Sequence, residues 1–141
     1  MAERIEVTAT LRGPWATDVG TRDHEVRIDE PRSAGGDDTG MMPTEAFIAS
    51  LAACFCMAVA WAARKRELEV PGLSVTVTAH RAGNELRYER IDVDAHAELE
   101  DETLARLVER ARSFCWVSNT LAAGVQVEYR HTTSLDARFR K

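Results

Sequence analysis

Several features that would indicate a class of function are scarce or missing in this sequence. Three cysteines in 141 residues form no even disulfide framework, which is typical of a reducing compartment, so we expect a cytoplasmic protein. The four histidines have no metal-ligand spacing, and there is no CxxC pair, glycine-rich phosphate loop or nucleophile elbow. We therefore expect neither a metal nor another cofactor.

Positive charge is also scarce. The chain has 18 Lys and Arg against 23 Asp and Glu, a net charge of -5, which argues against nucleic acid or an anionic membrane as a partner. The first residues, MAERIEV, contain no apolar run and indicate no secretory signal. The length and the ordinary composition predict a single domain over residues 1–141.

One long apolar stretch occupies residues 42–67, and within 46–63 only Ser50 is polar. Alanine dominates the stretch and Pro43 suits a first helical turn, so we predict a helix. A helix that is apolar on every side is either a membrane span or a core helix covered all round. Its length is at the lower limit for a span and amphipathic strands flank it, so we interpret it as a core helix.

Alternating apolar and polar residues on both sides of this helix predict antiparallel strands. A loop from Pro31 to Met42 leads into the helix, and Gly83-Asn84 predicts the turn of a hairpin after it. A polar tail is predicted from Thr132 to Lys141. The predicted strands cover residues 5–11, 15–19, 25–29, 73–79, 91–99 and 125–129, with a turn at 20–23.

A second, amphipathic helix is predicted after Asp101, which we expect to cap it. Leu104, Val108, Ala111 and Cys115 recur at helical spacing and predict one apolar stripe. The order of elements is then βββ-α-ββ-α-β, an α+β domain with antiparallel sheets. One sheet and one further helix cannot cover an apolar helix on every side, so the sequence predicts a homodimer.

The cysteines leave two interpretations open. Cys54 and Cys56 are about 200° apart on a helix and cannot act on one substrate together. Cys54 and Cys115, on two different helices, could come within disulfide reach. Cysteines in a core are more often inert small hydrophobic residues, so an unreactive pair is the simpler interpretation of the spacing alone.

A reactive Cys54 would need a nearby cation, because only the thiolate is nucleophilic. Cys54 lies about 15 Å into the helix, too deep for the helix dipole to help, and its neighbours are apolar. Arg12, at the end of the first strand, is the preferred candidate, and Arg22, in the following turn region, is the second. For each arginine taken alone, a solvated surface residue is the simpler interpretation.

Two motifs in the chain are typical of one known family. Residues 29–60, DEPRSAGGDDTGMMPTEAFIASLAACFCMAVA, contain an acidic, glycine-rich loop that leads into a Pro-x-Glu helix start, and Cys54 follows Pro43 by eleven positions. Later in the chain comes Cys115-Trp116-Val117-Ser118. These residues resemble the OsmC/Ohr family, in which a first cysteine has the same separation from the proline and the second lies in a Cys-Pro-x-Ser motif. The order of elements agrees along nearly the whole chain.

The resemblance implies an intertwined homodimer, with two central helices back to back and antiparallel sheets wrapped around them. It also implies a thiol peroxidase of the oxidative stress response, which reduces organic hydroperoxides and is recycled by a dithiol reductant. Cys54 would be the peroxidatic cysteine and Cys115 the resolving cysteine, with Arg12 and Glu45 as further catalytic residues.

The chain departs from the family pattern at two positions. Trp116 replaces the usual proline after the second cysteine. In the hydroperoxide-resistance branch a glutamate directly follows the proline, but here Thr44 does, and Glu45 comes one position later. On an ideal helix Glu45 lies about 180° from Cys54. The alternative is therefore a non-catalytic dimer that binds a small apolar ligand, or senses oxidants, through Cys54.

Overall fold

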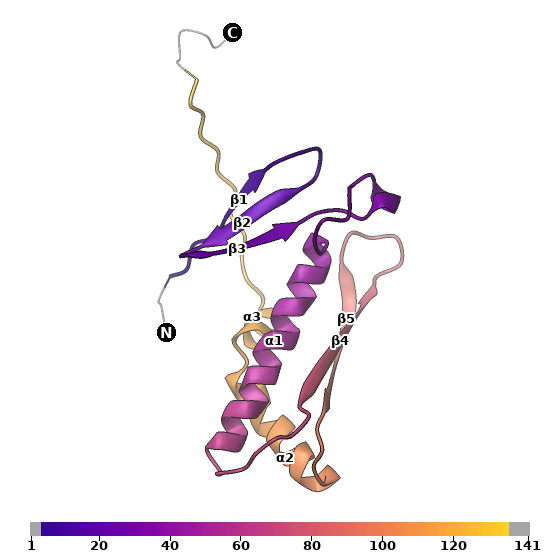
Figure 1. The fold of residues 1–141 in the computed structure, drawn as a ribbon, viewed down its shortest axis with the longest axis vertical. Coiled ribbons are helices and arrows are strands. Elements are labelled where there is room, and N and C mark those ends of the chain that lie inside the picture. Colours follow the sequence, from indigo (N-terminus) through magenta and orange to yellow (C-terminus); the bar gives the residue numbers. More distant parts are fainter. Residues whose placement is uncertain (1–3, 136–141) are drawn as a thin grey trace.

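The structure is a computed structural model that describes residues 4–135. A three-stranded sheet lies near one end of a long helix, and a hairpin and two further helices pack along that helix (Figure 1). The predicted α+β class and the antiparallel pairing are confirmed. The elements are β1 (Thr8–Leu11), β2 (Thr17–Thr21), β3 (His24–Ile28), η1 (Arg32–Ala34), α1 (Pro43–Arg64), β4 (Ser74–Arg81), β5 (Tyr88–His96), α2 (Asp101–Ala111), η2 (Arg112–Phe114) and α3 (Trp116–Ala123).

The strands β1, β2 and β3, which we call the N-terminal sheet, separate apolar from polar side chains. The register aligns Ala9 with Val19 and Val19 with Val26, so these apolar side chains share one face. The next row contains Asp18 and Arg27 and belongs to the opposite, polar face. Val26 is nevertheless 54% exposed, so the apolar face is not covered by the rest of the chain.

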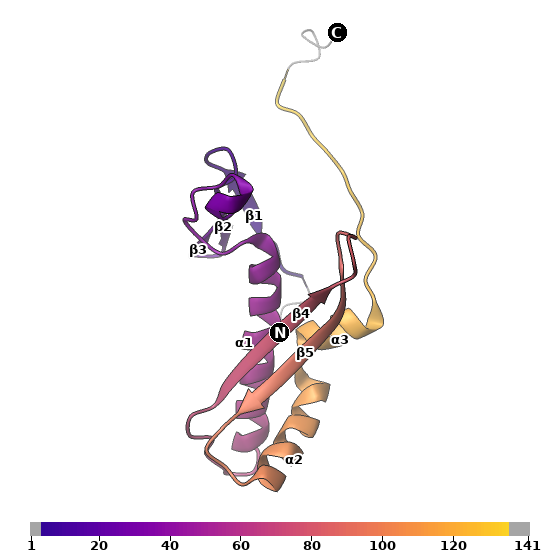
Figure 2. The same cartoon turned by 90° about the vertical axis from the view of Figure 1, so that its right-hand side faces the viewer.

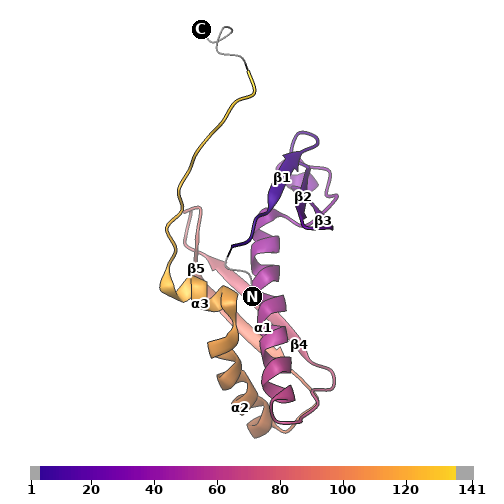
Figure 3. The ribbon, with the colours of Figure 1, turned by 90° about the vertical axis from the view of Figure 1, so that its left-hand side faces the viewer.

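The N-terminal sheet projects past the start of α1. It makes at most slight contact with α1, β4 or β5. Two views at right angles to Figure 1 show it beyond the helix end, away from the hairpin (Figure 2, Figure 3). The loop of residues 29–42 joins it to α1.

The remaining elements, α1, β4, β5, α2, η2 and α3, form what we call the body. Its core contains Leu51, Phe55 and Val59 of α1 together with Leu107 and Ala111 of α2. The apolar face of the β4–β5 hairpin packs against the same cluster. The body therefore buries one apolar side of α1 together with the apolar faces of α2 and the hairpin. The apolar face of the N-terminal sheet has no such core within the described residues.

The helix α1 lies within the predicted apolar stretch. Pro43 forms its first turn, and the backbone N–H of Met42 donates to Oε1 of Glu45 at 2.9 Å, which caps the helix. By length and composition alone α1 could cross a membrane, a test that core helices of soluble proteins also pass. Only 33% of its most apolar window is buried within this chain.

The predicted last strand, residues 125–129, is not formed in the described chain. After Gly124 the backbone runs as an exposed segment that pairs with none of the described strands, and Tyr129 is 89% exposed. Alternation of side chains suits a strand, but a strand also needs the N–H and C=O groups of a neighbour. Of the predicted polar tail, residues 136–141 lie outside the described part.

The second helix is shorter than predicted. It ends at Ala111, and the turn η2 separates it from α3. The hydroxyl of Ser113 donates to the carbonyl oxygen of Arg110 at 3.0 Å, a local bond that competes with continuation of the helix. Cys115 therefore occupies the N-cap position of α3 and does not continue the stripe of α2.

Other boundaries differ by a few residues. The strand β2 begins at Thr17, because Gly13 to Trp15 form the bend before it. The hairpin turn is confined to Arg22 and Asp23, with Arg22 at a φ of 52°. Glu100, not Asp101, is the N-cap residue of α2, and it makes no side-chain cap bond.

Candidate active site

Cys54 lies where the core of the body meets an open groove. One side of its position packs against the buried cluster that includes Leu51 and Phe55. The other side lines a groove of about 1090 Å³ between α1 and residues 113–125. The thiol is half-buried and forms no disulfide. A small molecule that enters the groove can therefore reach the sulfur while the core stays intact.

The walls of this groove are mainly apolar and aromatic. Trp61 and Phe114 contact each other edge to face, with ring centroids 4.3 Å apart and planes at 66°. Met57 and Trp116 also line the groove. Its volume and lining suit a small organic molecule with an apolar body.

Arg64 contributes a positive charge to the groove lining. It follows Cys54 by ten residues, about 15 Å along the helix, so its side chain cannot contact the sulfur. The one sequence signal for Arg64 is its place at the end of the apolar stretch, where a cation suits a helix C-terminus. The helical spacing of Cys54, Ala58 and Trp61 was a sequence signal for part of the groove, but nothing in the sequence placed Phe114 and Trp116 opposite them.

Cys115 is fully buried and belongs to the core cluster against which Cys54 packs. It is not a lining residue of the groove. The hydroxyl of Ser118 donates to the carbonyl oxygen of Cys115 at 3.2 Å in the first turn of α3. The structure thus brings the two sulfurs to the same core, one at the groove and one behind it. Cys56 is half-buried on another face of α1.

Glu45 does not approach Cys54 within one chain. Its carboxylate caps α1 at Met42, and its side chain lines a different groove, of about 440 Å³, between the N-terminal half of α1 and β4. This agrees with the helical spacing, which places Glu45 and Cys54 on opposite sides of the helix.

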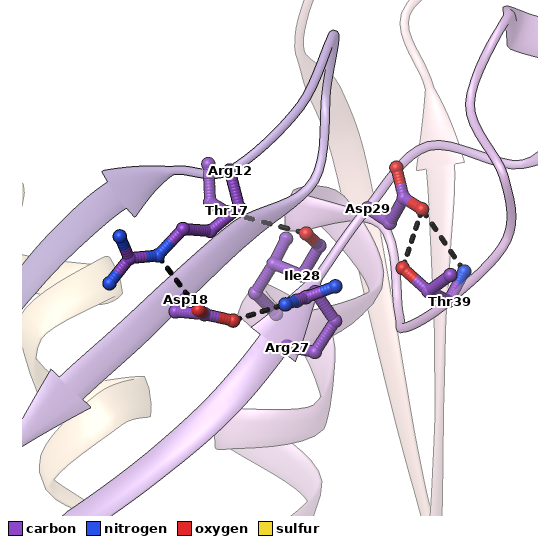
Figure 4. Close-up of polar contacts among 7 residues, drawn as sticks. All are labelled: Arg12, Thr17, Asp18, Arg27, Ile28, Asp29 and Thr39. Atoms are coloured by element: carbon purple, nitrogen blue, oxygen red, sulfur yellow. Dashed lines mark hydrogen bonds and ion pairs between the residues drawn. The ribbon is translucent and has the colours of Figure 1, made fainter.

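Arg12 also lies away from the Cys54 groove. Its Nε donates to Oδ2 of Asp18 at 3.0 Å, while Nε of Arg27 donates to Oδ1 of Asp18 at 2.7 Å (Figure 4). The hydrogen bond from Arg27 is the largest cause that holds the pKa of Asp18 below its usual value, and the bond from Arg12 acts in the same direction. Arg22 lies at the distal turn of the same sheet.

A metal site is not indicated by the donor set. Within residues 4–135 no group of three or more His, Cys, Asp or Glu side chains lies close enough to hold a metal ion. The chemistry that the described groove offers is that of a half-buried thiol in apolar surroundings.

Comparison with known proteins finds a matching family model and solved structures with a similar fold. A family model described as OsmC-like protein matches residues 35–130. No curated protein gives a significant match. Among solved structures, an OsmC-like protein from Mycoplasma pneumoniae is similar with a TM-score of 0.73 and 19% identity, over 86% of this chain and 89% of that chain.

Two organic hydroperoxide resistance proteins are also similar. The one from Vibrio cholerae, solved with captopril bound in one of its active sites, has 28% identity and a TM-score of 0.66, over 86% of this chain and 87% of that chain. The one from Bacillus subtilis has 27% identity and a TM-score of 0.58, over 83% and 89% respectively. The family-model match spans more than half of the sequence, and the chain therefore belongs to the OsmC-like protein family.

Proposed function

We propose that this protein is a thiol peroxidase that reduces organic hydroperoxides, with Cys54 as the peroxidatic and Cys115 as the resolving cysteine. The observation that carries the proposal is the half-buried thiol of Cys54 in a large apolar groove, with a second free thiol in the core behind it. Relatives with 27% and 28% identity are organic hydroperoxide resistance proteins, which supports the same substrate class.

The reaction balances with these two thiols. The Cys54 thiolate attacks one oxygen of ROOH, the O–O bond breaks, the alkoxide takes up a proton to leave as ROH, and Cys54 becomes a sulfenic acid. The sulfur of Cys115 then attacks the sulfur of Cys54, the S–S bond forms, and the hydroxyl group leaves with a proton as water. A dithiol reductant returns both cysteines to thiols by exchange.

The proposal includes a homodimer. Two-thirds of the most apolar window of α1 is not buried in the single chain, and Met57 on this helix is 71% exposed. Exposed apolar surface of this kind marks an interface, and a second copy is the partner always present. Since neither Arg12 nor Glu45 reaches the groove within one chain, the cation that favours the Cys54 thiolate would come from the second copy. Arg12 is the first candidate and Arg22 the second.

The test is a thiol titration before and after addition of cumene hydroperoxide. We expect the wild type to lose two thiols per chain and to regain them with a dithiol. Cys54→Ser should abolish peroxide consumption, Cys115→Ser should permit one turnover and leave a sulfenic acid that dimedone labels, and Cys56→Ala should be nearly silent. A wild type that loses no thiols would refute the peroxidase.

The source of the cation has its own test, the pH dependence of Cys54 alkylation by iodoacetamide. We expect Arg12→Ala to shift this profile upward by about one pH unit, because removal of a nearby guanidinium disfavours the thiolate. Arg22→Ala should leave the profile unchanged. The reverse result would exchange the two roles, and two unchanged profiles would remove both arginines from the mechanism.

A second candidate function is a dimer that binds a small apolar ligand or senses oxidants without turnover. It is favoured by Thr44, which stands where peroxidases of the family have a glutamate, and by the engagement of Glu45 in the helix cap. A ligand that quenches the fluorescence of Trp61 and Trp116, with no consumption of hydroperoxide, would support this function over the peroxidase.

A further inference from the structure

The loop between the N-terminal sheet and α1 is organised around one buried carboxylate. Asp29 is 2% exposed. Its Oδ2 accepts hydrogen bonds from the hydroxyl of Thr39 at 2.7 Å and from the backbone N–H of Thr39 at 3.1 Å (Figure 4), and its Oδ1 accepts one from the N–H of Glu30 at 2.8 Å. The bond from the Thr39 hydroxyl is the largest cause that keeps the pKa of Asp29 below its usual value.

Backbone hydrogen bonds close the same loop on itself. The N–H of Asp29 donates to the carbonyl oxygen of Met41 at 3.0 Å, and Ile28 and Met41 form a short parallel bridge. The N–H of Asp38 donates to the carbonyl oxygen of Glu30 at 3.1 Å. The end of β3 is therefore hydrogen-bonded to Met41, the residue that precedes the N-cap of α1.

Two glycines allow close backbone contacts here, one within the loop and one between the loop and β3. A Cβ at Gly36 would stand 2.0 Å from the carbonyl oxygen of Glu30, and a Cβ at Gly40 would stand 2.1 Å from the carbonyl oxygen of Arg27. Any side chain at either position would push the backbones apart. The conformation of this loop thus depends on the Asp29 carboxylate, on Thr39 and on two glycine positions.

This loop determines where the N-terminal sheet points, because the sheet makes at most slight contact with the body. One further contact of the sheet region supports the loop: Gly35, at a φ of 91°, lies so that a Cβ would be 3.4 Å from Nε1 of Trp15. A flexible loop would let the sheet change its orientation, and that freedom would be lost when a partner binds, at an entropic cost. A rigid loop fixes the orientation before binding and so lowers this cost.

We propose that Asp29 is a positioning residue: through Thr39 it fixes the direction in which the N-terminal sheet leaves α1 and so presents the apolar face of that sheet to a second copy of the chain. The partner is a second copy because the exposed apolar face of the sheet and the exposed apolar side of α1 occur together on one molecule. The inference rests on the homodimer proposed above and extends it by naming the residue that orients the docking surface.

The test measures the dimer dissociation constant by sedimentation and the exchange of amide hydrogens in residues 29–41. Asp29→Asn and Thr39→Val should each raise the dissociation constant by about tenfold or more and speed exchange in the loop. Exchange in β4 and β5 should stay as in the wild type, because the body keeps its own core. Thr39→Ser retains both bonds to Asp29 and should behave as the wild type.

A control removes an exposed, hydrogen-bonded carboxylate elsewhere. Asp92 lies on the polar face of the hairpin, where its Oδ2 is 2.8 Å from Nε2 of His80. This pair is far from the loop in sequence. Asp92→Asn should leave both the dimer and the loop unchanged.

The outcomes separate this inference from the proposed dimer. A wild type that is monomeric at every concentration refutes the dimer and the inference with it. A dimeric wild type whose affinity survives Asp29→Asn and Thr39→Val refutes the inference alone. Equal weakening by Thr39→Val and Thr39→Ser also refutes it, since the serine keeps the hydroxyl. Should Asp29→Asn fail to fold, the Thr39 pair alone decides.

Discussion

The N-terminal sheet and the β4–β5 hairpin are alike in sequence pattern and differ in what covers them. Both alternate apolar and polar residues, and both carry an aspartate on the polar face that pairs with a strand neighbour, Asp18 with Arg27 and Asp92 with His80. The apolar side of the hairpin packs against α1 and α2 within the same chain. Among the described residues, the apolar side of the N-terminal sheet has no comparable cover, and Val26 is about half exposed.

The difference shows that alternation identifies the apolar face of a strand but does not identify its cover. The hairpin follows α1 closely and can fold back onto it, so its contacts form within the chain. The N-terminal sheet is held past the helix start by the loop at 29–42, which places it out of reach of the same helix. The dimer that we propose would cover this face, whereas the apolar face of the hairpin is already covered within the chain.

The largest expected effect comes from the core of the body. Leu107 is 1% exposed, and Leu107→Ala should lower the free energy of unfolding by about 2–5 kcal/mol, because it removes buried surface and leaves a cavity. Urea denaturation followed by circular dichroism measures this. Val26→Ala should cost far less in the same assay at protein concentrations where the chain is monomeric, and equal losses would contradict the comparison.

A substitution on the apolar face of the N-terminal sheet should weaken the dimer and leave the stability of the body nearly unchanged. Val26→Asp places a charge on the face where we propose that a second copy docks, so the dimer dissociation constant should rise by at least about tenfold. Unfolding of the body in urea should change by less than about 0.5 kcal/mol, as for other exposed positions. Glu25→Ala, on the polar face of the same strand, is the control. An unchanged dissociation constant for Val26→Asp would show that this face is not the interface.

Gly40→Ala should loosen the junction of the two regions. Its Cβ would meet the carbonyl oxygen of Arg27 at 2.1 Å, so the loop must move, at a cost of about 1–3 kcal/mol. Amide exchange should quicken in residues 29–41 and in β3. Gly13→Ala meets nothing within 4 Å and should leave exchange nearly unchanged. Protection that persists in Gly40→Ala would mean that the loop does not lie on β3.

The smallest of the four predicted effects is the loss of loop stability in acid. The folded pKa of Asp29 is below the ordinary value of 3.8, chiefly because of the Thr39 hydroxyl, so its stabilising contribution is complete above that value. The contribution is lost as the pH falls from about 3.8 toward the lower folded value. Amide protection of residues 29–41 should decline over this range. Asp29→Asn should lack that dependence, and an identical acid response in both proteins would remove Asp29 as its cause.

Much of the candidate site could be predicted from local patterns. The alanine-rich run with Pro43 and Glu45 at its start predicted α1, and the eleven-residue separation placed Cys54 in the family's register. The two cysteines do border one core, as two inward-facing positions on different helices suggested. Prediction failed for the last position of the predicted stripe, Cys115. The helix α2 ends at Ala111, and Cys115 is the N-cap residue of α3.

By itself, the sequence determined the helix, the alternating strands, the family and the positions of the cysteines. These follow from spacing along the chain, because helix and strand periodicities act over a few residues. Only the tertiary structure decided that Arg12 pairs with Asp18, that Glu45 caps its own helix and that Thr39 donates to the buried Asp29. It also decided that residues 125–129 pair with none of the described strands. A charged side chain forms a hydrogen bond with whichever partner the folded chain brings within about 3 Å, and spacing along the sequence does not predict that distance.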